Sequence, residues 1–198
     1  MLSTPILLDY QSSTPCSKDV VDSMKPFWSE IFSNPSNKSN LAGINASAIL
    51  EASREKIEQN LFLKNKKVIF TSGATESNNL ALLGFARNYY KKTGNYGHII
   101  TLKTEHKAVL EPLHQLKKEG FMVTEITPER DGIISEEQFR KNIREDTFLV
   151  SVMMANNEIG VIQPIENISK ICKLRGITFH SDFAQCLGYV ELENLLSV

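Results

Sequence analysis

The chain has 198 residues, of which 41% are hydrophobic and 23% are charged, and these values are typical of a folded globular protein rather than a disordered one. Lys and Arg number 22 against 23 Asp and Glu, so the net charge is −1, and the two signs are mixed along the chain. A protein that binds nucleic acid or a membrane surface would instead concentrate its basic residues, so neither partner is expected.

The cysteines and the chain start indicate the compartment. No apolar run approaches the roughly 18 residues of a membrane-spanning helix. The first ten residues have no basic n-region, so a secretory signal peptide is not expected. Cys16, Cys172 and Cys186 are scattered and form neither a C-x-x-C pair nor a zinc spacing. We therefore expect a reducing, cytoplasmic location and no metal site.

The first part of the chain predicts helices separated by a loop. An extended segment ends near Pro15, and Ser17 is suited to cap a helix over 17–32 that Pro26 interrupts. The segment 33–40 is rich in Asn and Ser, which favour loops. Apolar residues then recur at helical spacing over 46–61.

From residue 67 onward, strands and helices alternate. Runs of β-branched and apolar residues predict strands at 67–71, 98–102, 121–126, 148–153 and 177–180. Apolar residues three or four positions apart predict helices at 76–90, 106–119, 135–143 and 165–174. In the first of these helices, Leu80, Leu83 and Ala86 are expected on the buried side. The alternation indicates an α/β fold on a mostly parallel sheet.

Polar clusters follow four of the predicted strands, at 71–76, 103–106, 156–158 and 181–185. Ligands of parallel sheets bind at the carboxyl ends of strands, so the four clusters can surround one ligand. Ser72, Gly73 and Thr75 open a helix and suit a phosphate, although a simple capped helix gives the same pattern. No lysine follows Gly73, which excludes a nucleotide P-loop.

The remaining clusters hold side chains suited to a flat, charged ligand. Asp182 can pair with a protonated ring nitrogen, or it can cap the segment that follows. His106 can stack on a ring or move protons, or it can be an ordinary first-turn residue. Asn157 and Gln185 can contact a ring oxygen, or they can be turn residues.

Read together, these segments closely resemble the cysteine desulfurases of iron–sulfur cluster assembly and nitrogenase maturation. The resemblance rests on SGATESNN at 72–79, TEHKAV at 104–109, NNEIGV at 156–161 and HSDFAQ at 180–185. It extends over residues 7–190 in the order and spacing of the family. LDY at 8–10 and NPS at 34–36 also match the start of that family.

The resemblance implies a pyridoxal 5'-phosphate enzyme of the aspartate-aminotransferase-like fold that works as a homodimer. Residues 1–15 would begin the small domain, and 16–198 would be an incomplete, C-terminally truncated large domain. The family removes sulfur from L-cysteine, leaves L-alanine and an enzyme persulfide, and passes the sulfur to an iron–sulfur scaffold or another acceptor protein.

The same resemblance implies a role for each site residue. Ala74 and Thr75 would bind the phosphate, and His106 would stack on the pyridine ring and assist proton transfer. Asn157 and Gln185 would contact the ring oxygen. Asp182 would pair with the pyridinium nitrogen.

The sequence also departs from the family pattern. The lysine that binds the cofactor lies in a Ser-x-His-Lys segment beyond the stretch matching 185–198, and the persulfide cysteine and the substrate-binding arginine lie later still. We therefore expect this chain to be inactive alone. Asn40 stands where the family usually has His, Ser12-Ser13 where it often has Ala-Thr, and Phe183 where it has a small residue.

Three alternatives remain open from the sequence. One is another enzyme of the same fold, a selenocysteine lyase or an aminotransferase. The second is a non-catalytic remnant that binds a partner chain. The third is a nucleotide-binding α/β protein, which the absent P-loop lysine disfavours.

Overall fold

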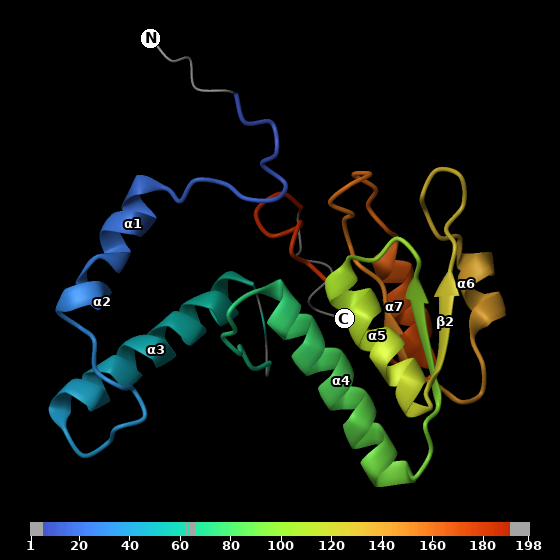
Figure 1. The fold of residues 1–198 in the computed structure, drawn as a ribbon, viewed down its shortest axis with the longest axis horizontal. Coiled ribbons are helices and arrows are strands. Elements are labelled where there is room, and N and C mark those ends of the chain that lie inside the picture. The colour runs from blue at the N-terminus through green and yellow to red at the C-terminus, as the bar shows by residue number, and fades with distance from the viewer. Residues whose placement is uncertain (1–5, 62, 64–65, 191–198) are drawn as a thin grey trace. The chain divides into compact units, whose positions relative to one another are not determined.

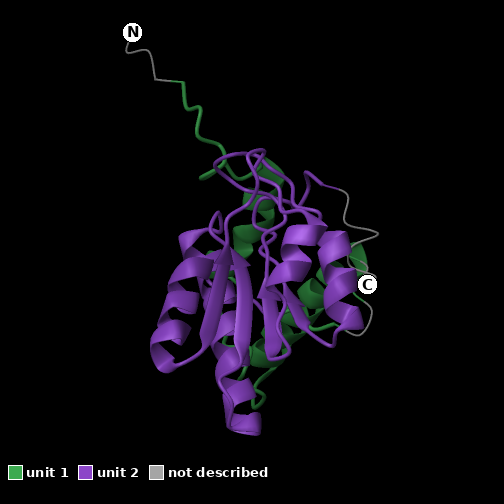
Figure 2. Cartoon of the chain, turned by 90° about the vertical axis from the view of Figure 1, so that its right-hand side faces the viewer, with its two compact units in different colours: residues 1–68, 197 green, residues 69–196, 198 purple. Residues whose placement is uncertain are grey.

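The computed structural model describes residues 6–61, 63 and 66–190, and the chain divides at Val68 and Ile69 into two compact units (Figure 2). Unit 1 holds helices α1 (Lys18–Met24), α2 (Pro26–Ser29) and α3 (Leu41–Asn60). Ser17 caps α1 by accepting a hydrogen bond from the Val20 N–H at 3.4 Å. Pro26 occupies the first turn of α2, so the predicted interruption at this residue is confirmed.

Helix α3 begins five residues before the predicted start because Asn40 caps it. The Asn40 side-chain oxygen accepts a hydrogen bond from the Gly43 N–H at 2.7 Å. A β-carbon at Gly43 would lie 2.0 Å from the Asn37 carbonyl oxygen, so only glycine fits this turn. The sequence prediction missed this start because the first turn of α3 follows a loop-forming segment.

Unit 2 is built on a four-stranded sheet within the described residues, with the strand order β2-β1-β3-β4. The strands are β1 (His98–Leu102), β2 (Met122–Ile126), β3 (Thr147–Ser151) and β4 (Thr178–His180), and each neighbouring pair is parallel. The helices are α4 (Ala74–Thr93), α5 (Lys107–Glu119), α6 (Glu136–Asn142) and α7 (Ile165–Leu174) (Figure 1). The predicted α/β architecture with a parallel sheet is confirmed.

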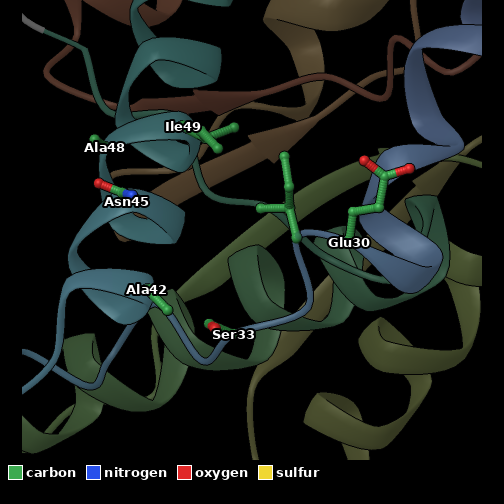
Figure 3. A pocket seen from close by; sticks show the side chains of 7 residues that line it. Glu30, Ser33, Ala42, Asn45, Ala48 and Ile49 are labelled. Carbon is green, nitrogen blue, oxygen red and sulfur yellow. The ribbon is translucent and has the colours of Figure 1, made fainter.

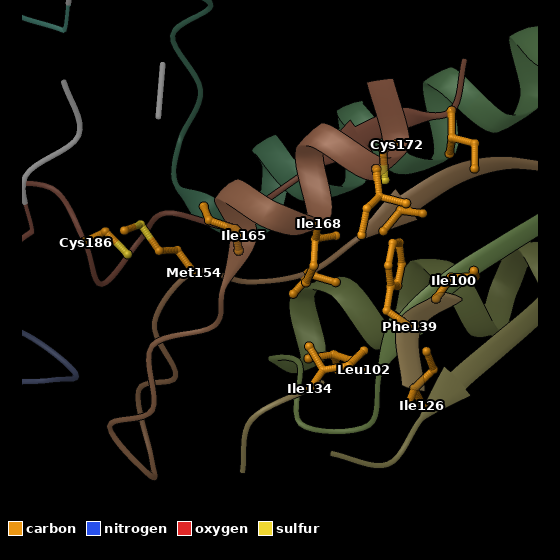
Figure 4. Packing of buried hydrophobic residues seen from close by; sticks show 14 residues of the cluster. Ile100, Leu102, Ile126, Ile134, Phe139, Met154, Ile165, Ile168, Cys172 and Cys186 are labelled. Carbon is orange, nitrogen blue, oxygen red and sulfur yellow. The ribbon is translucent and has the colours of Figure 1, made fainter. Parts of the chain in front are cut away.

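The sheet is buried on both faces. Ile99 and Leu149 join the buried side chains of α4 and α5 in one apolar cluster. Ile100 and Val150, the next residues along the same strands, join those of α6 and α7 in a second cluster, shown in Figure 4. Successive side chains of a strand point to opposite faces, so a strand covered on both faces carries apolar residues at consecutive positions, as β1 and β3 do at Ile99-Ile100 and Leu149-Val150.

One buried histidine ties three strands together at the amino end of the sheet. His98 is fully buried, and its ring nitrogens lie 2.8 Å from the Thr147 and Thr124 hydroxyls, which belong to β3 and β2. Burial lowers the pKa of His98. The neutral imidazole can satisfy one donor and one acceptor without leaving a buried charge.

Two sequence predictions in this unit are wrong. Residues 67–71 do not form a strand, and Ile69 and Phe70 are exposed, because no strand of the described residues pairs with them. In α4 Ala86 is buried and Leu83 packs partly buried against the same cluster, as predicted, but Leu80 is exposed and the other buried positions are Asn78 and Leu82. Leucines at 80, 82 and 83 lie on neighbouring faces of the helix, so spacing alone did not select the buried one.

Two further points concern the chain as a whole. Among the helices that the structure describes, none combines the length and apolarity needed to cross a membrane. The expected domain boundary after residue 15 stays a prediction.

Candidate active site

Three of the four predicted polar clusters follow strands of one sheet. Residues 103–106 follow β1, the 153–158 segment follows β3, and residues 181–185 follow β4. Because β1, β3 and β4 are parallel neighbours, these segments open at the same edge. The fourth cluster, 71–76, leads directly into α4 instead of following a strand.

The start of α4 carries the predicted phosphate-binding residues. Ala74 is the first helical residue, Thr75 the second, and both are exposed. The Ser72 N–H and hydroxyl donate to the Glu76 carboxylate at 2.7 and 2.6 Å, and these bonds lower the pKa of Glu76. The first-turn N–H groups and the positive end of a 20-residue helix dipole favour an anion at Ala74 and Thr75.

His106 caps α5 and is thereby fixed in orientation. Its Nδ1 accepts a hydrogen bond from the Ala108 N–H at 3.1 Å. An accepting Nδ1 places the proton of the neutral ring on Nε2, which leaves Nε2 as the outward donor. His106 and Thr75 line the same open hollow of about 370 Å³ between α4 and α5, so the structure brings these two predicted residues together.

Asp182 lies two residues after the end of β4 and is only 9% exposed. Its backbone carbonyl accepts a hydrogen bond from the Met154 N–H at 3.2 Å, so the pairing of β3 and β4 extends to this residue. Its carboxylate accepts two further bonds, one from the Asn78 side chain at 2.8 Å and one from the Ala184 N–H at 2.9 Å. A buried carboxylate held by neutral donors is the group that a ring cation requires.

Two neighbours of Asp182 are kept uncharged by burial. Burial raises the pKa of Glu105 to about 8, and the nearby Asp182 charge adds to this rise. Burial lowers the pKa of His180 to about 4, although Asp182 acts in the opposite direction. Neither side chain therefore brings a full charge to the surroundings of Asp182 at neutral pH.

The loops after β1 and β3 are joined by two hydrogen bonds. The Met153 N–H donates to Glu105 Oε1 at 2.7 Å, and the Asn156 side chain donates to the Thr104 carbonyl at 2.7 Å. Asn156 also accepts from the N–H groups of Glu158 and Ile159, which folds the 156–159 turn. These bonds fix the backbone on either side of the predicted residues His106 and Asn157.

Asn157 and Gln185 lie half-buried in the loops that follow β3 and β4. Their position at the sheet edge is compatible with the predicted contacts to a ring oxygen. Those contacts themselves stay predictions.

The residues present fit pyridoxal 5'-phosphate. A helix start suits the phosphate, and Asp182 suits the ring nitrogen. Asn78 belongs to α4 and bonds to Asp182, so both ends of the cofactor would be held in one site. Sequence reasoning gave no role to Asn78 or Glu105. Asn78, Leu82 and Ala86 recur every four residues and therefore lie on one face of α4, where Leu82 and Ala86 are fully buried. A polar residue on a face that is otherwise apolar is the sequence signal for Asn78.

A second hollow lies in unit 1 and contains none of the predicted site residues. It measures about 400 Å³ and is lined by side chains that include Glu30, Ile31, Asn45 and Ile49 (Figure 3). Its lining offers one carboxylate and no cation, so it lacks the groups that would hold a phosphate.

Comparisons with known proteins identify the family. The chain belongs to the aminotransferase class-V family, whose model matches residues 6–193. It is 48% identical over 192 residues to a protein named cysteine desulfurase IscS of Ehrlichia chaffeensis, covering 97% of this chain and 46% of that protein. It is 46% identical to a mitochondrial cysteine desulfurase of Eremothecium gossypii, covering 96% of this chain and 38% of that one.

Solved structures agree with this assignment. A structure titled "SspA in complex with cysteine" matches with a TM-score of 0.87 and 38% identity, over 96% of this chain and 54% of that one. A NifS-like protein matches with a TM-score of 0.88 and 36% identity, over 96% and 52%. The predicted resemblance to cysteine desulfurases and the predicted fold class are confirmed, and the chain spans about half the length of the curated relatives it matches.

Proposed function

We propose that the protein acts as a cysteine desulfurase, which removes sulfur from L-cysteine, releases L-alanine and forms an enzyme persulfide for iron–sulfur cluster assembly. One observation carries the proposal: the buried Asp182 carboxylate bonds to the same helix whose first turn can bind a phosphate. The family match and the relatives named as cysteine desulfurases support it.

The proposed cofactor is pyridoxal 5'-phosphate, which supplies an electron sink when bound. Ala74 and Thr75 would bind its phosphate, and Asp182 would hold a proton on its ring nitrogen. Asn157 and Gln185 would orient the ring through its oxygen substituent. His106 would stack on the pyridine ring and assist proton transfer through Nε2, because its Nδ1 already accepts a hydrogen bond.

The 198-residue chain is proposed to be inactive by itself. It contains no lysine after Lys173, so no lysine follows Asp182. Burial raises the pKa of Cys172 to about 12 and also raises that of Cys186, which disfavours the nucleophilic thiolate at both. Cys16 is exposed, and the family pattern does not place the persulfide cysteine at its position. A homodimer, a sulfur-acceptor protein as partner and a cytoplasmic location complete the proposal.

A titration of the purified chain with pyridoxal phosphate tests the cofactor site. The expected result is weak, saturable and reversible binding, without sulfide release from cysteine above the rate of free cofactor. Asp182→Asn should weaken binding more than Cys186→Ala, because only the first removes the ring partner. Absence of saturable binding would contradict the proposed site, and equal losses in the two variants would contradict the role of Asp182.

A non-catalytic, partner-binding role is the second candidate. It is favoured by the exposed apolar side chains of unit 1, which include Trp28, Phe32 and Leu41. Such exposure on a folded unit is typical of a surface that another chain covers. A chain that binds no cofactor but elutes with a partner polypeptide would favour this role.

A further inference from the structure

Asn78 makes a side-chain hydrogen bond to Asp182. Its Nδ2 donates to Asp182 Oδ2 at 2.8 Å, although the two residues are 104 positions apart in the sequence. Both are buried, at 4% and 9% exposure. A hydrogen bond of this kind between an amide and a carboxylate is strengthened where water is excluded.

The contact fixes the carboxylate while leaving it able to bind a further donor. Oδ2 accepts from Asn78 and Oδ1 accepts from the Ala184 N–H. Each carboxylate oxygen can accept more than one hydrogen bond, so capacity remains for a third donor. Both recorded donors are neutral amides, so neither cancels the negative charge that a ring cation would seek.

The helix that carries Asn78 cannot turn it away from Asp182. Leu82 and Ala86 follow Asn78 at intervals of four residues, and both are fully buried against the sheet. Rotation of α4 would expose these side chains to water. Ala74 and Thr75 lie one turn before Asn78, so a single anchored helix carries the proposed phosphate end and the donor to Asp182.

We propose that Asn78 is a positioning residue, which holds the Asp182 carboxylate in place for the ring nitrogen of the cofactor. This inference rests on the proposed function. It assigns to Asn78 no contact with the cofactor itself. The effect of replacing Asn78 should therefore depend on the nitrogen atom of the ligand's ring. Loss of packing or of the phosphate site would instead weaken the binding of every ligand of the same shape.

The experiment compares two ligands that differ at one ring atom. Pyridoxine 5'-phosphate carries the ring nitrogen, and its carbocyclic analogue carries a C–H group there. Neither has an aldehyde, so neither can react with surface lysines. Dissociation constants of both ligands are measured by calorimetry for the full chain and for Asn78→Leu, which keeps the side-chain size and removes the donor.

Asn88→Leu is the matched control, because Asn88 lies on the exposed side of the same helix. We expect Asn78→Leu to raise the dissociation constant of pyridoxine 5'-phosphate about tenfold, which is the effect typical of losing a hydrogen bond to a charged group. In Asn78→Leu the dissociation constant of the analogue should change by less than about twofold. Asn88→Leu should leave the dissociation constants of both ligands unchanged. If Asn78→Leu does not fold, Asn78→Ala is used with the same expectations.

The bound ligand's absorbance gives a second readout. Wild-type chain should keep the ring in its protonated form to a higher pH than Asn78→Leu does. Equal weakening of the two ligands, or no weakening of either, would overturn the positioning role and leave cofactor binding intact. Failure of the wild-type chain to bind either ligand would overturn the proposed function and, with it, the positioning role of Asn78.

Discussion

The Glu105 carboxylate accepts a hydrogen bond from the Met153 backbone N–H at 2.7 Å, across the gap between the loops that follow β1 and β3. Its other oxygen, Oε2, is buried and has no hydrogen-bond partner among the described residues. A carboxyl group so placed is stabilised in its protonated form, since an ionised oxygen without a donor would be costly there.

Replacing Glu105 by Gln should stabilise the chain at neutral and mildly basic pH. Folding raises the pKa of Glu105 from 4.5 to about 8, so the folded state binds the proton more tightly than the unfolded state. Stability is therefore full below pH 4.5 and declines as the pH rises toward 8. Gln retains an accepting oxygen and cannot ionise, so it should gain about 4 kcal/mol at pH 8.

Urea unfolding of wild type and Glu105→Gln at pH 4.5 and pH 8 measures this difference. The two proteins should converge at the lower pH. Glu145→Gln, an exposed position in a loop, is the control and should follow wild type at both values. A constant difference between wild type and Glu105→Gln across this range would show that Glu105 is ionised in the fold.

His180 should make the chain lose stability in acid. Its Nδ1 lies 2.9 Å from the Ser151 hydroxyl, and burial lowers its pKa from 6.5 to about 4. Here the unfolded state binds the proton more tightly, so stability is full above pH 6.5 and is lost as the pH falls toward 4. His180→Gln should flatten that part of the stability curve by about 2 kcal/mol.

The measurement is the free energy of unfolding at intervals between pH 4 and pH 7. His114→Gln is the matched control, because the His114 side chain is 42% exposed. If the free energy of unfolding falls equally steeply in acid for wild type and for His180→Gln, His180 is not buried in its neutral form.

Phe139→Ala should destabilise the fold by about 3–5 kcal/mol. Phe139 lies in α6, is fully buried and packs in the cluster with Ile100, Ile126 and Ile168. Truncating a buried aromatic side chain removes its transfer free energy and leaves a cavity. Leu174→Ala, at a position that is 85% exposed, should change the unfolding free energy by less than about 0.5 kcal/mol. Equal effects in a chemical denaturation experiment would refute the packing described for α6.

The purified chain should self-associate as its concentration rises. Trp28 and Phe32 of unit 1 are 79% and 77% exposed, and several neighbouring apolar side chains are also open to water. Covering such surface is favourable by roughly 25 cal/mol per Å². Light scattering after size-exclusion chromatography should show species larger than a monomer, and Trp28→Glu should reduce their share. A monodisperse monomer with one sharp, reversible unfolding transition would count against this prediction.

Much of the fold could be predicted from local patterns. Ser17 caps a helix as its position indicated, and the strands at 98–102 and 147–151 lie in runs rich in β-branched and apolar residues and are buried on both faces. The run at 67–71 has the same β-branched character but joins no sheet among the described residues, and strand pairing depends on distant segments that a local pattern does not contain.

The candidate site divides in the same way. Asp182 and His106 stand out because each lies in a short polar segment that follows an apolar strand. Asn78 does not, because its role depends on a contact with a residue 104 positions later. Glu105 likewise acquires its raised pKa only when the fold buries its carboxyl group, and the hydrogen bond from the Met153 N–H opposes that rise.

The strand order β2-β1-β3-β4 has a further consequence for the loops at the carboxyl edge of the sheet. From β1 the chain moves outward to β2, then reverses direction to reach β3 and β4, and right-handed crossovers place α5 on one face and α6 and α7 on the other. The connections after β1 and β3 therefore diverge toward opposite faces of the sheet. The Glu105–Met153 and Asn156–Thr104 bonds join these two connections near the points where they leave the sheet, so their first residues are held at a fixed separation. The rest of each connection can change in sequence and length while the hydrogen-bonded sheet stays the same.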